Sequence, residues 1–315
     1  MRQATVLPLF GVFSALLPLC GCSGTASSAL SGTPAVVTPA PVAPEPRTPP
    51  VKEPPARVTT RKANTQGMVF VTEYHNFGYE KGNMFRTPEK FAKDLKRLYD
   101  LGFRPVTASE YLNDKMDLPP GASPVIMTFD DSQPTQFKLL ADGSLDPKCA
   151  MGVWEKFAKA HPDFPMKGTF FVLPRMWDQP KLRAKKVAMI KEWGSELANH
   201  TVHHPALRTK NDETVMSEVA GGIELLRKYG IHEPAMFAMP YGSTPKNRAL
   251  IKQFKYKGQV FKTAGAFLAG ANPAPPPGKV NRYKVPRILA QPGNLGLDFW
   301  LDRVEQGKVS LYVAP

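Results

Sequence analysis

The sequence predicts an α/β fold with a parallel sheet or barrel at its centre. Short apolar runs rich in β-branched and aromatic residues alternate with longer runs in which apolar residues recur at helical spacing. The clearest strand, residues 125–129, leads directly into Asp130 and Asp131, and a histidine cluster at residues 200–204 follows later in the chain. Because functional groups of such folds gather where strands end, the two segments indicate one site at that edge.

The N-terminal part of the chain is predicted to lie outside the folded domain. Residues 1–21 have a positive start and an apolar core, which is typical of a signal peptide. This segment runs into Cys22 and resembles a bacterial lipobox, with an ordinary secretory signal as the alternative. Residues 22–66 are rich in Pro and Ala and predict a disordered tether, followed by a domain over residues 67–315. We therefore expect an exported protein, lipid-anchored at Cys22 in the bacterial cell envelope and facing the periplasm or exterior.

The net charge limits the classes of molecule that the protein can bind, and the cysteine content limits its disulfides. The net charge of +14 favours anionic surroundings such as a membrane surface or an acidic glycan. Nucleic acid is excluded as a partner, because export separates the two and no base-reading module is visible. No obligate protein partner is evident. Cys149 is the single cysteine of the predicted domain, so no disulfide can form within it, and a buried apolar role is expected.

The elements follow one another in the order expected of an α/β fold. Residues 68–74 predict a first strand that ends at His75, and Thr87 and Pro88 give the start of a helix that Gly102 ends. Later strands are expected at residues 103–107, 125–129, 167–173, 235–239, 259–261 and 285–289. Later helices are expected at residues 108–112, 136–140, 151–160, 183–193, 212–229 and 295–305, with another after residue 242.

The acids and histidines suggest metal chemistry. For an isolated Asp-Asp pair at a strand end, a turn or helix cap is the simpler interpretation. The histidine cluster favours a metal site over a turn or cap, because one carboxylate and two imidazoles can bind a metal and a second carboxylate beside them can act as a base. His200 and His204 are four residues apart, a spacing that can aim both rings at one point. This donor set suits Zn²⁺ or a similar transition metal such as Co²⁺ or Ni²⁺.

Several motifs together resemble the NodB-homology polysaccharide deacetylases, carbohydrate esterase family 4. Residues 128–132 read Thr-Phe-Asp-Asp-Ser against the family's T-F-D-D-G, and residues 200–205 match H-S/T-x-x-H-P in full. Residues 168–172 are similar to the family's A-T-F-F-V strand, and residues 237–242 resemble F-R-x-P-Y-G without its arginine. The resemblance covers nearly the whole predicted domain. It implies an irregular (β/α)7-type barrel and hydrolysis of N-acetyl groups on a polysaccharide.

The resemblance also implies roles for individual residues. It makes Asp131, His200 and His204 the metal ligands and Asp130 the base that takes a proton from a metal-activated water. The backbone N–H of Tyr241 would hold the oxyanion. His203 is not expected to be a ligand.

The sequence departs from the family in two places. No histidine follows His232, whereas the family's usual acid is a late histidine. Exported poly-N-acetylglucosamine deacetylases resemble a permuted version with an early Tyr-His element, and His75 in residues 74–75 matches this acid. Ala238 replaces the arginine that would face Asp130, so Arg287 or another residue is expected to substitute, although a strand arginine can equally form a surface ion pair.

Three functions remain open. The leading one is a metal-dependent deacetylase of an N-acetylglucosamine-type envelope or extracellular glycan. The second is the same fold acting on xylan, a chitin oligomer or a cyclic amide, and the third is a glycan-binding pseudoenzyme. The tryptophans could stack on sugar rings, but burial in the core is the more frequent role: Trp154, Trp177, Trp193 and Trp300.

Overall fold

A computed structural model describes residues 60–80, 82, 84–232 and 234–315, all within one compact unit. The predicted signal peptide, Cys22 and most of the tether lie outside these residues. Contacts with the folded part begin a few residues before the predicted domain start at residue 67, since Asn64 forms a backbone bridge with Val313. The side chain of Arg61 also donates hydrogen bonds to the carbonyls of Gly102 and Gly121.

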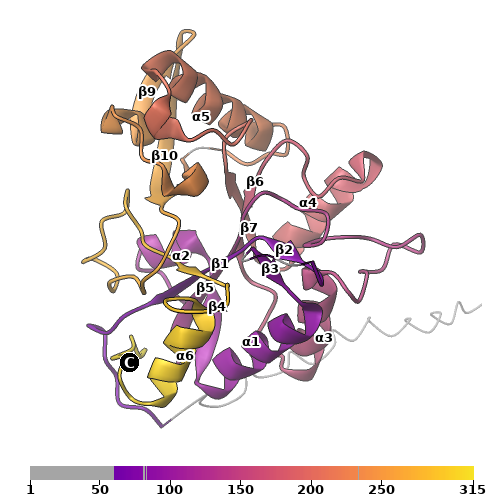
Figure 1. Ribbon diagram of the computed structural model, residues 1–315, viewed down its shortest axis with the longest axis vertical. Coiled ribbons are helices and arrows are strands. Elements are labelled where there is room, and N and C mark those ends of the chain that lie inside the picture. Colours follow the sequence, from indigo (N-terminus) through magenta and orange to yellow (C-terminus); the bar gives the residue numbers. More distant parts are fainter. Residues whose placement is uncertain (1–59, 81, 83, 233) are drawn as a thin grey trace, which may run out of the picture. The chain divides into compact units, whose positions relative to one another are not determined.

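A mostly parallel sheet forms the centre of the described chain (Figure 1). Nine strands of the described part belong to it, in the order β11-β1-β5-β6-β7-β8-β10-β9, with β4 paired to β5. The strands are β1 (Phe70–Tyr74), β4 (Phe103–Val106), β5 (Ser123–Phe129), β6 (Thr169–Val172), β7 (Glu196–Asn199), β8 (Ala235–Ala238), β9 (Gln253–Tyr256), β10 (Gln259–Phe267) and β11 (Ile288–Leu289). Two short strands, β2 (Asn76–Phe77) and β3 (Phe85–Arg86), pair separately.

The pairing confirms the α/β class and shows how far the sheet closes. All neighbouring strands of the main sheet are parallel except the β9–β10 hairpin. A single parallel bridge from Phe267 to Val285 joins β10 to the segment that precedes β11. Since β11 pairs with β1, this bridge lies at the seam of the sheet, where further hydrogen bonds run from Ala266 N to Arg282 O and from Asn272 N to Arg287 O. The predicted barrel is therefore irregular and lacks a continuous ladder at this point.

The residues of β5 alternate between two faces of the sheet, as the pleat of a strand requires. Met127 and Phe129 pack in the core beneath the helices, and Ile126 packs in a second core on the inner face. Burial of each large apolar side chain contributes about 1.5–3 kcal/mol, which fixes the register of the strand. Asp130 follows Ile126 by an even number of residues, so the same alternation places it toward the inner face.

The helices lie around the outside of the sheet (Figure 1). Hydroxyl or amide side chains cap three of them: Thr87 accepts a hydrogen bond from Lys90 N, Thr107 forms a capping box with Glu110, and Asn211 accepts from Thr214 N. The helices are α1 (Pro88–Asp100), α2 (Ala108–Leu112), α3 (Ala150–Ala160), α4 (Arg183–Glu192), α5 (Asp212–Arg227) and α6 (Leu297–Glu305). Within the described residues, none is long and apolar enough to cross a membrane.

Two predicted helices are wrong. Residues 136–140 form turns and a bridge between Leu139 and Leu145, because the buried amide of Gln136 bonds to backbone carbonyls instead of facing solvent from a helix. The helix expected after residue 242 is only a short 3₁₀ turn, η4 (Arg248–Ile251), which leads into the β9–β10 hairpin. The hairpin forms in place of the predicted helix because it lets Phe254 and Phe261 stack in the core that α5 covers.

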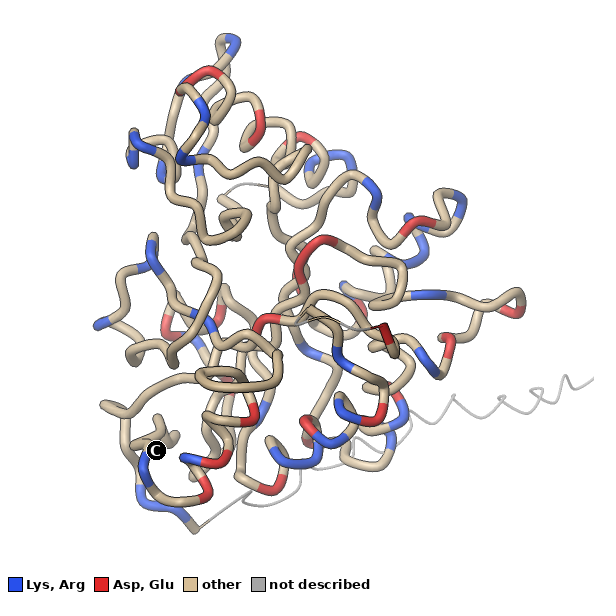
Figure 2. The backbone as a smooth tube through the Cα atoms, viewed as in Figure 1, with Lys and Arg blue, Asp and Glu red and all other residues tan. Residues whose placement is uncertain are grey.

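Cys149 is buried as expected, and the basic residues are widely distributed (Figure 2). Lys and Arg are spread on all sides of the described chain and are not confined to one face (Figure 2). Cys149 is buried, and its Sγ accepts a hydrogen bond from Gly152 N at the start of α3.

Candidate active site

The site lies where β5, β7 and β8 end. Its loops hold non-glycine residues in the left-handed region of the backbone, which costs about 1–3 kcal/mol each and occurs mainly at functional sites. These residues are Asp131, Ser132, Thr201, His204 and Tyr241. Packing and hydrogen bonds hold them there. The Ser132 hydroxyl, for example, both accepts from Leu173 N and donates to Leu173 O.

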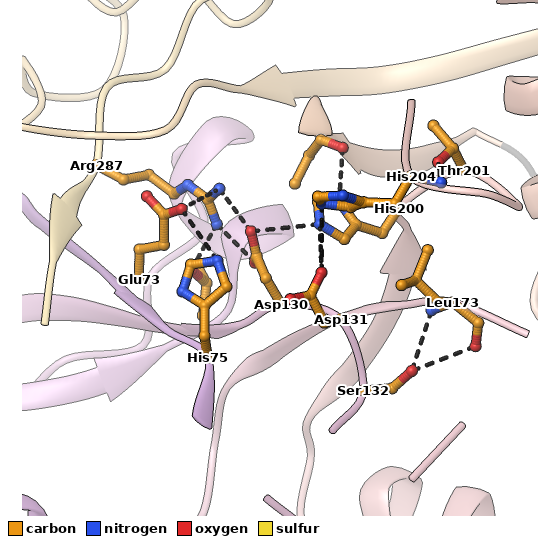
Figure 3. Close-up of polar contacts among 12 residues, drawn as sticks. Glu73, His75, Asp130, Asp131, Ser132, Leu173, His200, Thr201, His204 and Arg287 are labelled. Carbon is orange, nitrogen blue, oxygen red and sulfur yellow. Dashed lines mark hydrogen bonds and ion pairs between the residues drawn. The ribbon is translucent and has the colours of Figure 1, made fainter. Parts of the chain in front are cut away.

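Asp131, His200 and His204 converge on one point (Figure 3). The Oδ1 atom of Asp131 lies 3.3 Å from Nε2 of His200 and 3.3 Å from Nε2 of His204. One ligand atom from each residue lies within 4.8 Å of the other two. The structure thus brings together the three residues that the sequence nominated as ligands.

The donor atoms of this cluster fit a metal ion. Asp131 Oδ1 and His200 Nε2 are buried and make no hydrogen bond within the described residues. Nδ1 of His200 lies 2.8 Å from the carbonyl of Ala238 and donates to it, which leaves Nε2 unprotonated in the neutral ring. Buried polar atoms without partners destabilise a fold, so a cation coordinated by one atom of each of the three residues would remove this destabilisation.

Metal binding requires deprotonated ligands, and the pKa shifts of two of the three residues favour that form. The third, His200, has a raised pKa, because the charges of Asp130 and Asp131 outweigh burial, so a metal would have to displace its proton. Burial alone would raise the pKa of Asp131, but the neighbouring imidazoles, above all His200, hold it below its usual range. Burial and the charge of His200 lower the pKa of His204. The carboxylate and the neutral imidazole are therefore the favoured forms of these two residues near neutral pH.

Asp130 is held next to the cluster by Arg287. The guanidinium donates from Nη1 to Oδ1 and from Nη2 to Oδ2 of Asp130, each at 2.7 Å, and both side chains are almost fully buried. Burial would raise the pKa of Asp130, but Arg287 and then His200 lower it below the usual value. Oδ2 of Asp130 lies 3.7 Å from Nε2 of His200. Arg287 therefore supplies the cation that Ala238 lacks, from the segment immediately before β11.

Arg287 is itself fixed by the interior of the sheet. Its Nε donates to the carbonyl of Leu268 at 2.6 Å, and its Nη1 also donates to the hydroxyl of Thr128 at 3.0 Å. These bonds orient the planar fork toward Asp130.

His75 lies on the other side of Asp130, next to a residue that the sequence reasoning missed. Glu73 is 3 % exposed, lies 3.6 Å from Nε2 of His75 and 3.2 Å from Nη2 of Arg287, and accepts from Gly270 N. Burial outweighs Arg287 and raises the pKa of Glu73 to about 7. An acid in the middle of an otherwise apolar strand, at residues 70–74, was the signal that could have revealed it.

The state of His75 follows from its burial. Its side chain is 7 % exposed, and Nδ1 makes no hydrogen bond within the described residues. Burial lowers the pKa of His75 more than the charges of Asp130 and Asp131 raise it. One ligand-type atom from each of Glu73, His75 and Asp130 lies within 4.8 Å of the other two, so the proton-carrying groups form one cluster (Figure 3).

The remaining residues that the sequence singled out lie in three different places. The exposed ring of Tyr241 contacts that of His204, with centroids 4.6 Å apart. His203 points away from the cluster, and its Nδ1 lies 2.7 Å from Glu218. Trp154 and Trp177 are fully buried in the main core, and Trp193 and Trp300 are partly buried against it, so the core role is the observed one.

Comparison with known proteins agrees with this geometry. The sequence model of the polysaccharide deacetylases matches residues 117–258. No curated protein sequence is significantly similar to the chain.

Solved structures share the fold at low sequence identity. The deacetylase PplD of Streptococcus pyogenes is 18 % identical with a TM-score of 0.57, and the match covers 75 % of this chain and 98 % of that one. IcaB from Ammonifex degensii is 21 % identical with a TM-score of 0.55, covering 77 % and 98 %. The polysaccharide deacetylase BC0361 of Bacillus cereus is 16 % identical with a TM-score of 0.55, covering 76 % and 69 %.

The matched segment contains Asp130, Asp131, His200 and His204, the residues that the structure brings to one edge of the sheet. The fold around them is that of the deacetylase structures. Residues 117–258 are therefore similar in sequence to the polysaccharide deacetylases, and the chain shares the fold of their solved structures.

Proposed function

We propose that the protein is a metal-dependent deacetylase that removes N-acetyl groups from an N-acetylglucosamine-type glycan of the cell envelope or its surroundings. The observation that carries the proposal is the convergence of Asp131, His200 and His204 on one point beside an Asp130 locked by Arg287. A set of metal ligands and a separately oriented carboxylate are two parts that metal-dependent hydrolysis of an amide needs.

Asp131, His200 and His204 would hold the metal. A bound Zn²⁺, Co²⁺ or Ni²⁺ supplies a Lewis acid that polarises a carbonyl and lowers the pKa of a water. The donor atoms of the three residues converge, and the pKa shifts of Asp131 and His204 favour their deprotonated forms. Three protein ligands are the number found at catalytic rather than structural zinc sites.

Asp130 would act as the general base. Because its carboxylate is ionised and oriented by two hydrogen bonds from Arg287, it can accept a proton from a water placed between it and His200. The N–H of Tyr241 would hold the oxyanion, and the contact of the Tyr241 ring with His204 supports this role.

His75 would donate the proton that the leaving amine requires. Because burial lowers its pKa, His75 favours its neutral form near neutral pH, so it would have to gain a proton within the site before acting as a general acid. Glu73, whose pKa of about 7 keeps a proton available near neutral pH, is its nearest acidic neighbour.

The N-terminal sequence and the net charge support an envelope location. A signal peptide with Cys22 as lipid anchor and a Pro-rich tether would keep the domain near a membrane, where a glycan substrate is within reach. The net charge of +14 favours an anionic environment.

The glycan-binding pseudoenzyme is the weaker candidate. Its two arguments were the missing arginine at Ala238 and the missing late histidine. Arg287 now occupies the position facing Asp130, and His75 lies within the same polar cluster. Both observations favour a working proton relay over a site that only binds.

Release of acetate from N-acetylglucosamine oligomers by metal-stripped protein, with and without added Zn²⁺ or Co²⁺, tests the proposal. We expect release only with added metal, and loss of release in Asp130→Asn while that variant still binds metal. Release from xylan or cyclic amides but not from the oligomers would assign the second substrate class. A metal-loaded protein that binds these oligomers and releases acetate from no substrate would instead identify a binding protein.

A further inference from the structure

We propose that helix α5 is the support that fixes the histidine loop in its metal-binding shape, with Glu218 as its main positioning residue. The inference rests on the metal site proposed above and adds residues that touch neither metal nor substrate. Three independent contacts between α5 and residues 199–204 carry it.

The first contact is the carboxylate of Glu218. Its Oε2 accepts hydrogen bonds from the backbone N–H groups of Val202, at 3.0 Å, and His203, at 2.8 Å. Its Oε1 lies 2.7 Å from Nδ1 of His203. Glu218 is 7 % exposed, whereas the side chain of His203 is 79 % exposed, so it is the carboxylate end of these bonds that is shielded from water. One side chain thus anchors the middle of the loop between the two predicted ligands.

The second contact ties the start of the loop to the same helix. The amide of Asn199 donates to the carbonyl of Val219 at 3.0 Å, and its Oδ1 accepts from Thr201 N at 2.8 Å. A Cβ atom at Gly222 would overlap Oδ1 of Asn199. The side chain of Asn199 therefore requires a glycine on the helix beneath it.

The third contact is the close approach of the Val202 side chain to Gly221, the residue before Gly222 on the helix. A Cβ atom at Gly221 would lie 2.5 Å from Cγ2 of Val202. Two adjacent glycines inside a helix cost about 1 kcal/mol each relative to alanine. The close approach of residues 199–202 gives a physical reason for both.

The loop needs such support because its backbone is strained. Thr201 has φ +70° and His204 has φ +55°, and both are non-glycine residues. A hydrogen bond from His204 N to the Thr201 hydroxyl, at 3.0 Å, closes the turn from within. If the contacts with α5 are removed, the loop can relax to an unstrained conformation and move His204 away from Asp131.

The test compares Glu218→Ala with Glu224→Ala, an exposed glutamate of the same helix. Zn²⁺ affinity of each metal-stripped full-length protein is measured by competition with a chromogenic chelator, alongside its thermal unfolding. We expect Glu218→Ala to bind Zn²⁺ about 10–100-fold more weakly, as seen when outer-shell partners are removed, and Glu224→Ala to bind as wild type. Glu218→Gln, which keeps an acceptor for both N–H groups, should recover most of the affinity.

Gly221→Ala keeps the inference testable if Glu218→Ala does not fold. Alanine favours the helix, so this variant should remain folded while its methyl group displaces Val202 and weakens Zn²⁺ binding. Wild-type affinity in the folded variants would overturn the inference and leave the deacetylase proposal intact. A wild-type protein that binds no Zn²⁺ would overturn both.

Discussion

Replacement of Arg287 by methionine is the sharpest test of the base. The change removes both hydrogen bonds to Asp130 and leaves its carboxylate in a site where the paired side chains are 1 % and 2 % exposed. Loss of one partner of such a buried pair costs about 3–5 kcal/mol, with little reduction for solvent screening at this burial. Burial then favours the protonated form of Asp130, because the charge that opposed it is gone.

The consequence is a specific change in pH dependence. In the wild type, the pKa of Asp130 lies below its usual value, so its ion pair contributes stability at neutral pH that is lost as the pH falls through the acid range. In Arg287→Met we expect that contribution to disappear, and the acid limb of kcat/KM to move to higher pH. At pH 7 activity should fall about 100-fold or more, the lower range for loss of a general base.

The assay is acetate release with saturating Zn²⁺ across pH 5–9, together with thermal unfolding. Arg86→Met provides the matched control, since Arg86 forms a buried ion pair with Asp94 away from the site. It should lose comparable stability without a shift in the pH profile. If Arg287→Met kept the wild-type acid limb, or if Arg86→Met shifted it equally, the assignment of Arg287 to the base would be refuted.

Four further predictions concern other parts of the protein. His75→Asn should lower kcat about 10²–10⁴-fold with unchanged Zn²⁺ content, and unchanged turnover would remove His75 as the acid. His200→Ala should lose Zn²⁺ measured by atomic emission, whereas retention of wild-type metal would contradict the ligand set. The raised pKa of Glu73 means that its ionisation destabilises the folded metal-free protein as the pH rises from about 4.5 to 7. Glu73→Gln should therefore reduce this loss of stability, and an unchanged pH dependence of thermal unfolding would contradict the raised pKa. Radiolabelled palmitate should label the wild type and not Cys22→Ser, and labelling of both would exclude the lipobox.

The local sequence was sufficient for the elements whose residues have one strong preference. The run into Asp130 reads as a buried strand because only a pleated, enclosed position suits so many β-branched and aromatic side chains. Helix α1 was predictable from Thr87 and Pro88, since caps act on their immediate neighbours. The helix expected at residues 136–140 failed because Gln136 makes its hydrogen bonds to distant carbonyls.

The sequence by itself also determined which groups can carry the chemistry. The spacing of His200 and His204 and the adjacent acids nominated residues that the structure does bring together. It could not decide between Arg287 and another cation for Asp130, because the two residues are 157 positions apart and meet only through the pairing of distant strands. Glu73 and Glu218 escaped notice for the same reason: burial and long-range contacts, which give each carboxylate its partners, exist only after the chain has folded.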